Sequence, residues 1–227
     1  MTSIHKIQKQ ILGICYKNKL SHIGSYISCL PILHRIFSDK HPADKVVLSC
    51  GHSSVALYCC LEAFEDENAE ALLEKHGCHP NLDPRSGIDC STGSLGLGIT
   101  VAVGYAVSNP DRKVHCIISD GECAEGSVWE SLNFISKNNI KNINIYVNAN
   151  GYCAYDSVDL VDLRKKLAAF VPDRQLYFYE TDFLDTPCLK GLNAHYHIMS
   201  EEDYNKALAH ADAYEQYCED YYSTEVF

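Results

Sequence analysis

Apolar residues fall along this chain either at helical spacing or in short continuous runs, and the two patterns predict helices and strands. Over residues 3–17, one broad face carries Ile4, Ile7, Ile11 and Ile14, as expected of an amphipathic helix. Further helices are predicted at 25–37, 53–64, 66–77, from the STGSLGLG segment to 108, and at 126–137, 158–170 and 200–222. Short apolar runs predict strands at 45–50, 114–119, 142–150 and 175–181.

Apolar strands that alternate with helices are typical of a parallel sheet. The chain has 227 residues, of which 46% are hydrophobic, and this suffices for a sizeable core. The usual size of domains favours one domain over residues 1–227. We therefore expect a single α/β domain, a parallel sheet with helices on both faces.

The charge balance argues against nucleic acid and anionic membrane as partners. Thirty acidic residues against 19 basic ones give a net charge of −11, and no cluster of Lys and Arg overrides it. The N-terminal residues lack the continuous apolar stretch of a signal peptide, and no run approaches the roughly 18 apolar residues of a membrane span. We expect a soluble, cytoplasmic protein.

Twelve cysteines raise the question of disulfides or zinc. No CxxC pair occurs, Cys59 and Cys60 are adjacent, and most of the others lie within apolar segments. A secreted scaffold of this cysteine density would usually be much shorter. The cysteines are therefore expected to be reduced and to act as small buried apolar residues.

Polar residues follow two neighbouring predicted strands. Asp120, Gly121 and Glu122 come directly after the strand at 114–119, and Asn150 closes the next strand. Ligands of parallel sheets bind outside the carboxyl ends of the strands, so this is the expected site. Carboxylate and amide oxygens suit Mg²⁺ or Ca²⁺, and a diphosphate could approach the backbone at a glycine.

Simpler interpretations remain open for each of these features. An Asp-Gly pair after a strand is most often a turn. The STGSLGLG segment could be an ordinary helix start, and it lacks the GK[ST] ending of a nucleotide-binding P-loop. A histidine near glycines is usually a hydrogen-bonding core or surface residue.

Three segments, in a fixed order between about residues 20 and 156, resemble the transketolase family. LSCGHSSVALY resembles its LSKGHAS-ALY signature, and GCHPNLDPRSGIDCSTGSLGLG resembles its HPE…PG-E-STGSLGQG segment. SDGECAEGSVWESLNF resembles GDGE-QEG-VWEA. In addition, SDG followed thirty positions later by NAN is similar to the thiamine-diphosphate motif. The resemblance implies the thiamine-diphosphate-binding fold and that cofactor.

The resemblance also assigns roles to individual residues. The implied ligands of the divalent metal, Mg²⁺ or Ca²⁺, are Asp120, Asn150 and the backbone carbonyl of Tyr152. Cofactor contacts are implied for His52, Gly93, Ser94, Leu95, Asp120, Gly121, Glu122 and Asn150. Three histidines are implied to be catalytic and to line the cofactor and substrate channel: His22, His52 and His79.

Four further residues are less tightly matched. Glu125 and Glu130 resemble acidic residues at the family's dimer interface, although they could equally lie on a solvated helix face. His195 and His197 loosely resemble a histidine late in the family domain. A zinc-like HxH interpretation of the two finds no cysteine partner in good register.

Several positions depart from the family pattern. Ser119 replaces the first glycine of GDG, Ile23 the proline of GHPG, and Leu97 the glutamine of GSLGQG, while Ala149 interrupts the asparagine pair. The region after Asp156 is shorter than expected, which predicts an abbreviated member that lacks one α/β unit.

Transketolases resemble a tandem of diphosphate-binding and pyrimidine-binding domains, and nothing here matches the second. The implied protein is the diphosphate-binding subunit of a split enzyme, which would form a heterotetramer with two copies of a pyrimidine-binding partner. It would transfer a two-carbon ketol unit from a ketose, expected to be phosphorylated, to an aldehyde. The alternatives are a non-catalytic or regulatory subunit, or another thiamine-diphosphate enzyme class that acts on 2-oxoacids.

Overall fold

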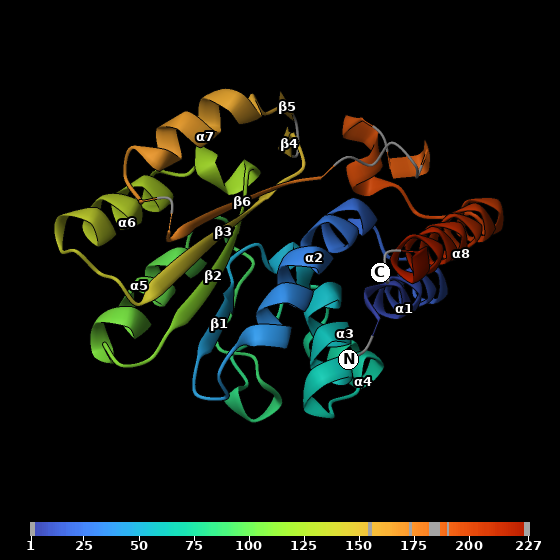
Figure 1. The fold of residues 1–227 in the computed structure, drawn as a ribbon, viewed down its shortest axis with the longest axis horizontal. Coiled ribbons are helices and arrows are strands. Elements are labelled where there is room, and N and C mark those ends of the chain that lie inside the picture. The colour runs from blue at the N-terminus through green and yellow to red at the C-terminus, as the bar shows by residue number, and fades with distance from the viewer. Residues whose placement is uncertain (1–2, 154–155, 173, 182–186, 190, 225–227) are drawn as a thin grey trace.

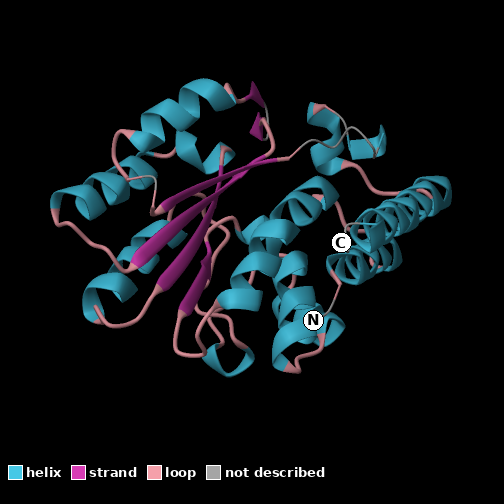
Figure 2. Cartoon of the chain, in the orientation of Figure 1, coloured by secondary structure: helices cyan, strands magenta, loops and turns pink. Residues whose placement is uncertain are grey.

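The computed structural model describes residues 3–153, 156–172, 174–181, 187–189 and 191–224, and its centre is a four-stranded parallel sheet (Figures 1 and 2). The strands are β1 (Lys45–Leu48), β2 (Val114–Ser119), β3 (Ile143–Ala149) and β6 (Leu176–Glu180), in the spatial order β1-β2-β3-β6. A small antiparallel hairpin of β4 (Tyr152–Cys153) and β5 (Asp156–Ser157) follows β3.

Helices cover both faces of the sheet (Figure 1). One face carries α1 (Ile4–Lys17), α2 (Ile23–Asp39), α3 (Ser54–Glu65) and α4 (Ala69–His76), with α8 (Glu201–Thr224) packed on α1. The other face carries α5 (Gly98–Ser108), α6 (Gly126–Lys137) and α7 (Leu160–Ala168). Short 3₁₀ helices lie at Gly51–Ser53, Pro84–Ser86, Gly121–Ala124, Pro187–Leu189 and Leu192–Tyr196.

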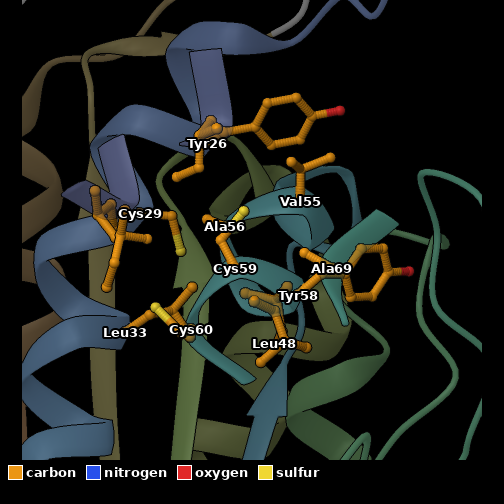
Figure 3. Packing of buried hydrophobic residues seen from close by; sticks show 14 of the residues in the cluster. Tyr26, Cys29, Leu33, Leu48, Val55, Ala56, Tyr58, Cys59, Cys60 and Ala69 are labelled. Atoms are coloured by element: carbon orange, nitrogen blue, oxygen red, sulfur yellow. The ribbon is translucent and has the colours of Figure 1, made fainter. Parts of the chain in front are cut away.

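The strands are buried on both faces, which is why they read as apolar runs. Every residue of β2 is buried; Ile117 belongs to the core under α2 and α3, whereas Cys116 and Ile118 belong to the core under α5 and α6. In Figure 3, Cys29 of α2 and Cys60 of α3 lie within the first of these cores. The eleven cysteines that the structure describes are unpaired and eight are buried, so they fill the interior as apolar residues.

The predicted α/β class, with a parallel sheet and helices on both faces, is confirmed, and most boundaries shift by one to three residues. The helix predicted at 66–77 begins at Ala69 because the Asn68 side chain caps it, accepting a 2.8 Å hydrogen bond from the Ala71 backbone N–H. Sequence periodicity missed the β4–β5 hairpin and the 3₁₀ turns before α8, because elements of two to five residues have no period to detect.

Two other expectations concern the size and surroundings of the chain. The chain passes from β3 through the hairpin and α7 to β6, and the predicted loss of one α/β unit after Asp156 stays a prediction. Among the helices within the described ranges, none combines the length and the apolar character that crossing a bilayer requires.

The carboxylate of Glu122 ties three segments of the fold together beneath the carboxyl ends of β1 and β2. The side chain is fully buried. One oxygen accepts hydrogen bonds from Ser49 Oγ at 2.6 Å and from the Gly96 backbone N–H at 2.8 Å. The other accepts a bond from the Ser119 backbone N–H at 2.9 Å. These bonds hold the glycine-rich loop before α5 against both strand ends.

Replacing this carboxylate should destabilise the fold. Glu122→Ala leaves buried donors of Ser49, Gly96 and Ser119 without an acceptor, and each such group costs roughly 1–3 kcal/mol. We expect the free energy of unfolding to fall by about 3 kcal/mol in urea denaturation. The matched control is Glu130→Ala on the exposed side of α6, which should stay within about 0.5 kcal/mol of wild type. Equal effects of the two variants would contradict this role.

Candidate functional site

A cavity of about 220 Å³ lies where β1, β2 and β3 end. Parallel strands bring their carboxyl ends to the same edge of the sheet, so the polar residues that follow them meet there. Nine of the residues predicted from the sequence line this cavity: His22, His52, His79, Gly93, Leu95, Asp120, Gly121, Asn150 and Tyr152.

Two predicted cofactor contacts lie outside the cavity lining. Ser94 is an exposed residue of the glycine-rich loop, and Glu122 lies beneath the cavity as the buried tie between strand ends. Glu125 and Glu130 are exposed, Glu125 as the N-cap of α6 and Glu130 within it. Contact of Ser94 and Glu122 with a cofactor and the interface role of Glu125 and Glu130 stay predictions.

Asp120 follows β2 and connects it to the end of β3. Its side chain is 2% exposed. Oδ2 accepts a hydrogen bond from the Gly151 backbone N–H at 2.6 Å, and Oδ1 accepts one from the Gly121 N–H at 2.9 Å. Burial raises the pKa of the Asp120 carboxyl to about 6, against the opposing effect of these hydrogen bonds.

The turn after β3 places Asn150 next to this carboxylate. Asn150 Oδ1 accepts a hydrogen bond from the Tyr152 backbone N–H at 3.0 Å, which forms an Asx turn, and Gly151 adopts a positive φ of 81°. The bond from Gly151 to Asp120 joins this turn to the end of β2. One carboxylate and one amide side chain therefore lie at adjacent strand ends, a donor set of hard oxygens.

Glycines allow the loops around the cavity to pack closely. A Cβ on Gly51 would lie 2.7 Å from Thr92 Oγ1 and 2.9 Å from the Gly93 backbone nitrogen. Gly93 itself has a φ of 146°, and a Cβ there would lie 3.3 Å from His79 Cδ2. The loop that carries His52 and the loop that carries Gly93 can therefore touch only as glycine backbone.

Histidines from four separate segments face the cavity. The ring centroid of His22 lies 4.3 Å from that of His195 and 5.9 Å from that of His52, while His79 is exposed at the cavity edge. His22 precedes α2 with a positive φ of 64°, and its backbone N–H donates to the His195 carbonyl at 3.0 Å. A non-glycine residue held in this left-handed conformation stores strain at the site.

His195 is the site residue that sequence reasoning left unresolved. The HYH segment offered two histidines without a register, and the structure separates them: His195 lines the cavity, whereas His197 lies 3.0 Å from Asp203 at the start of α8. The cavity also contains Ser25 and Cys153, which sequence reasoning missed. Small residues of this kind carry no pattern that marks them as site residues.

The buried histidines are poor bases. Burial, followed by the neighbouring histidines, lowers the pKa of His22 to about 4 and that of His52 to about 3. Burial also lowers the pKa of His195. These rings are therefore neutral near pH 7, and a neutral imidazole can both donate and accept a hydrogen bond.

The His22 and His52 ring signals in an NMR titration should not move between about pH 8 and 5, because both folded pKa values lie below that range. In the urea-unfolded chain the same rings should titrate near 6.5. The unfolded chain then binds protons that the folded chain refuses, so these two residues contribute less stability as the pH falls below about 6.5. His22→Gln and His52→Gln assign the signals, and a folded-state midpoint near 6.5 would contradict the burial effect.

Comparison with known proteins gives the family and the fold. The sequence model of the transketolase thiamine-diphosphate-binding domain matches residues 14–166. One of the two subunits of an apulose-4-phosphate transketolase from Phocaeicola vulgatus is 34% identical over 146 residues, 56% of this chain and 52% of that protein. The SqwG protein of a 6-deoxy-6-sulfo-D-fructose transketolase from Clostridium sp. is 32% identical over 148 residues, 56% of this chain and 54% of that protein.

The solved structure of transketolase from Leishmania mexicana superposes with a TM-score of 0.63 at 17% identity, over 96% of this chain and 46% of that one. This likeness confirms the predicted thiamine-diphosphate-binding fold. The chain spans about half the length of these two relatives and of that transketolase. Because the family match covers more than half of its residues, the chain belongs to the family of transketolase thiamine-diphosphate-binding domains.

Proposed function

We propose that this chain is the diphosphate-binding subunit of a split transketolase-like enzyme. The enzyme would transfer a two-carbon ketol unit from a phosphorylated ketose to an aldehyde, with thiamine diphosphate and Mg²⁺ or Ca²⁺. The observation that carries the proposal is the junction of Asp120 with the Asn150 turn at the carboxyl edge of the sheet, in a chain of this family. The cytoplasmic location expected from the sequence is part of the same proposal.

The charges around the cavity support a metal ion. None of the described residues that line the cavity is a lysine or an arginine, and Asp120 contributes a carboxylate. A diphosphate placed beside that carboxylate needs a positive charge to offset the repulsion. A divalent cation supplies it, and Asp120, Asn150 and the backbone carbonyl of Tyr152 would hold this ion through oxygen atoms. The absence of a side chain at Gly121 lets the diphosphate approach the backbone.

The histidines would act on the substrate. The bound cofactor supplies the carbanion chemistry, and the protein positions the substrate and moves protons. His22, His52 and His79 face the same cavity as His195. Neutral rings such as those of His22 and His52 can bind sugar hydroxyl groups as donor and acceptor at once. They would orient the donor ketose and the acceptor aldehyde in turn.

The size and charge of the cavity support a site that is completed by another chain. Its volume of about 220 Å³ lies below the roughly 300–1,000 Å³ of typical small-molecule sites. The lining residues that are described include no cation for a sugar phosphate. A pyrimidine-binding subunit would supply the phosphate-binding groups and the glutamate that activates the cofactor, in a heterotetramer with two copies of each chain.

Replacing Asp120 tests the metal and diphosphate site. Asp120→Asn keeps an oxygen that can accept from Gly151 but removes the charge on the metal ligand. Calorimetric titration of thiamine diphosphate with Mg²⁺ should show binding to the complex with the pyrimidine-binding subunit. The variant should bind at least about 100-fold more weakly, since altering even an outer partner of a metal ligand costs 10–100-fold. The matched control, Asp162→Asn on exposed α7, should bind like wild type.

The outcomes separate the proposal from its alternatives. No heat of binding even with the partner present would indicate a non-catalytic or regulatory subunit. Binding that the Asp120→Asn variant retains in full would contradict the assigned site. The assembled complex should then be assayed with phosphorylated ketoses and with 2-oxoacids as donors. Turnover of 2-oxoacids alone would place the chain in another class of thiamine-diphosphate enzyme.

A further inference from the structure

Three side chains with different metal-binding atoms converge beside the cavity wall. Cys188 lies in the 3₁₀ helix Pro187–Leu189, His197 follows the 3₁₀ helix Leu192–Tyr196, and Asp203 lies in the first turn of α8. One thiol sulfur, one imidazole nitrogen and one carboxylate oxygen all lie within 4.8 Å of one another. Figure 1 shows these short helical segments in orange between α2 and α8.

The spacing of these atoms is close to that of a tetrahedral zinc site. Zinc binds sulfur at about 2.3 Å and nitrogen or oxygen at about 2.0–2.2 Å, which places neighbouring ligand atoms roughly 3.5 Å apart. His197 Nε2 is 3.0 Å from Asp203 Oδ2, so small side-chain movements would admit an ion. A thiolate with an imidazole and a carboxylate favours Zn²⁺ over Mg²⁺ or Ca²⁺.

Helix capping accounts for Asp203 but not for the other two residues. Asp203 Oδ2 accepts hydrogen bonds from the Ser200 backbone N–H at 3.0 Å and from Ser200 Oγ at 2.8 Å, while the Asp203 N–H donates to Ser200 Oγ at 3.1 Å. This reciprocal arrangement is a capping box, which is complete without Cys188 or His197. Both nevertheless direct their donor atoms toward the same carboxylate.

The cluster is also accessible to an ion and to water. Cys188, His197 and Asp203 are each partly exposed. Three protein ligands with one open position for water form a known type of zinc coordination. The missing cysteine partner of the HYH segment is thus supplied by the tertiary structure, at a separation of nine residues from His197.

We propose that Cys188, His197 and Asp203 bind a Zn²⁺ ion that fastens the wall of the cavity to the start of α8. The wall segment contains Leu189 and His195, both of which line the cavity. His195 lies two residues before His197, so an ion at the cluster restrains its backbone. This role does not rest on the proposed transferase function.

Cobalt is the probe for this site, because a thiolate bound to Co²⁺ gives an ultraviolet charge-transfer absorption that oxygen and nitrogen ligands do not give. The full chain with its pyrimidine-binding partner should bind Co²⁺ with this absorption, and Zn²⁺ should displace it. Cys188→Ser should abolish the absorption. His197→Gln and Asp203→Asn should weaken binding at least tenfold, the lower bound for changing even an outer partner of a ligand; Asn keeps an acceptor for the Ser200 N–H.

Two controls locate the ion. Cys78→Ser alters a partly buried cysteine outside the cluster and should leave the absorption unchanged. Asp120→Asn should also leave it unchanged, so a failure of the diphosphate site is distinguishable from a failure of the zinc site. Circular dichroism shows whether each variant is folded, and Zn²⁺ should raise the melting temperature of wild type but not of Cys188→Ser. No thiolate absorption in the folded wild type, or an unchanged one in Cys188→Ser, would overturn the proposal.

Discussion

The buried carboxylate of Glu122 is the interaction on which the geometry of the cavity depends. It joins Ser49 after β1, Ser119 at the end of β2 and Gly96 of the glycine-rich loop, so three of the cavity's walls are held at fixed distances. Burial raises the pKa of this carboxyl, and the hydrogen bonds from the same three residues oppose that effect. A buried carboxylate is tolerated only with such partners, which fixes the positions of the segments around it.

The same burial sets the charges of the cavity. Asp120 brings a carboxylate whose pKa is raised to about 6, and His22 and His52 stay neutral because burial lowers theirs. The described lining thus provides oxygen ligands and neutral rings but no fixed cation. Positive charge for a diphosphate and for a sugar phosphate would have to come from a metal ion and from a second subunit, which fits a chain that spans half the length of the family members described above.

The remaining wall of the cavity is built without the sheet. The segment before α8 is anchored by apolar contacts of Leu189 and Met199 with the core, and it places His195 against His22. A zinc ion at Cys188 and His197 would give this short segment a second attachment that regular secondary structure gives the other walls. Binding of substrate and stability of the wall would then be coupled through His195.

The sequence alone determined the strands, the helices and the strand-end residues Asp120 and Asn150, because these depend on local periodicity and on short motifs with fixed spacing. Only the tertiary structure decided that Glu122 supports the cavity from below and that His195 lines it. Glu122 contacts Ser49, 73 positions away, and no local pattern encodes such a contact. The physical reason is that chain folding, through packing between elements distant in sequence, chooses which polar groups meet.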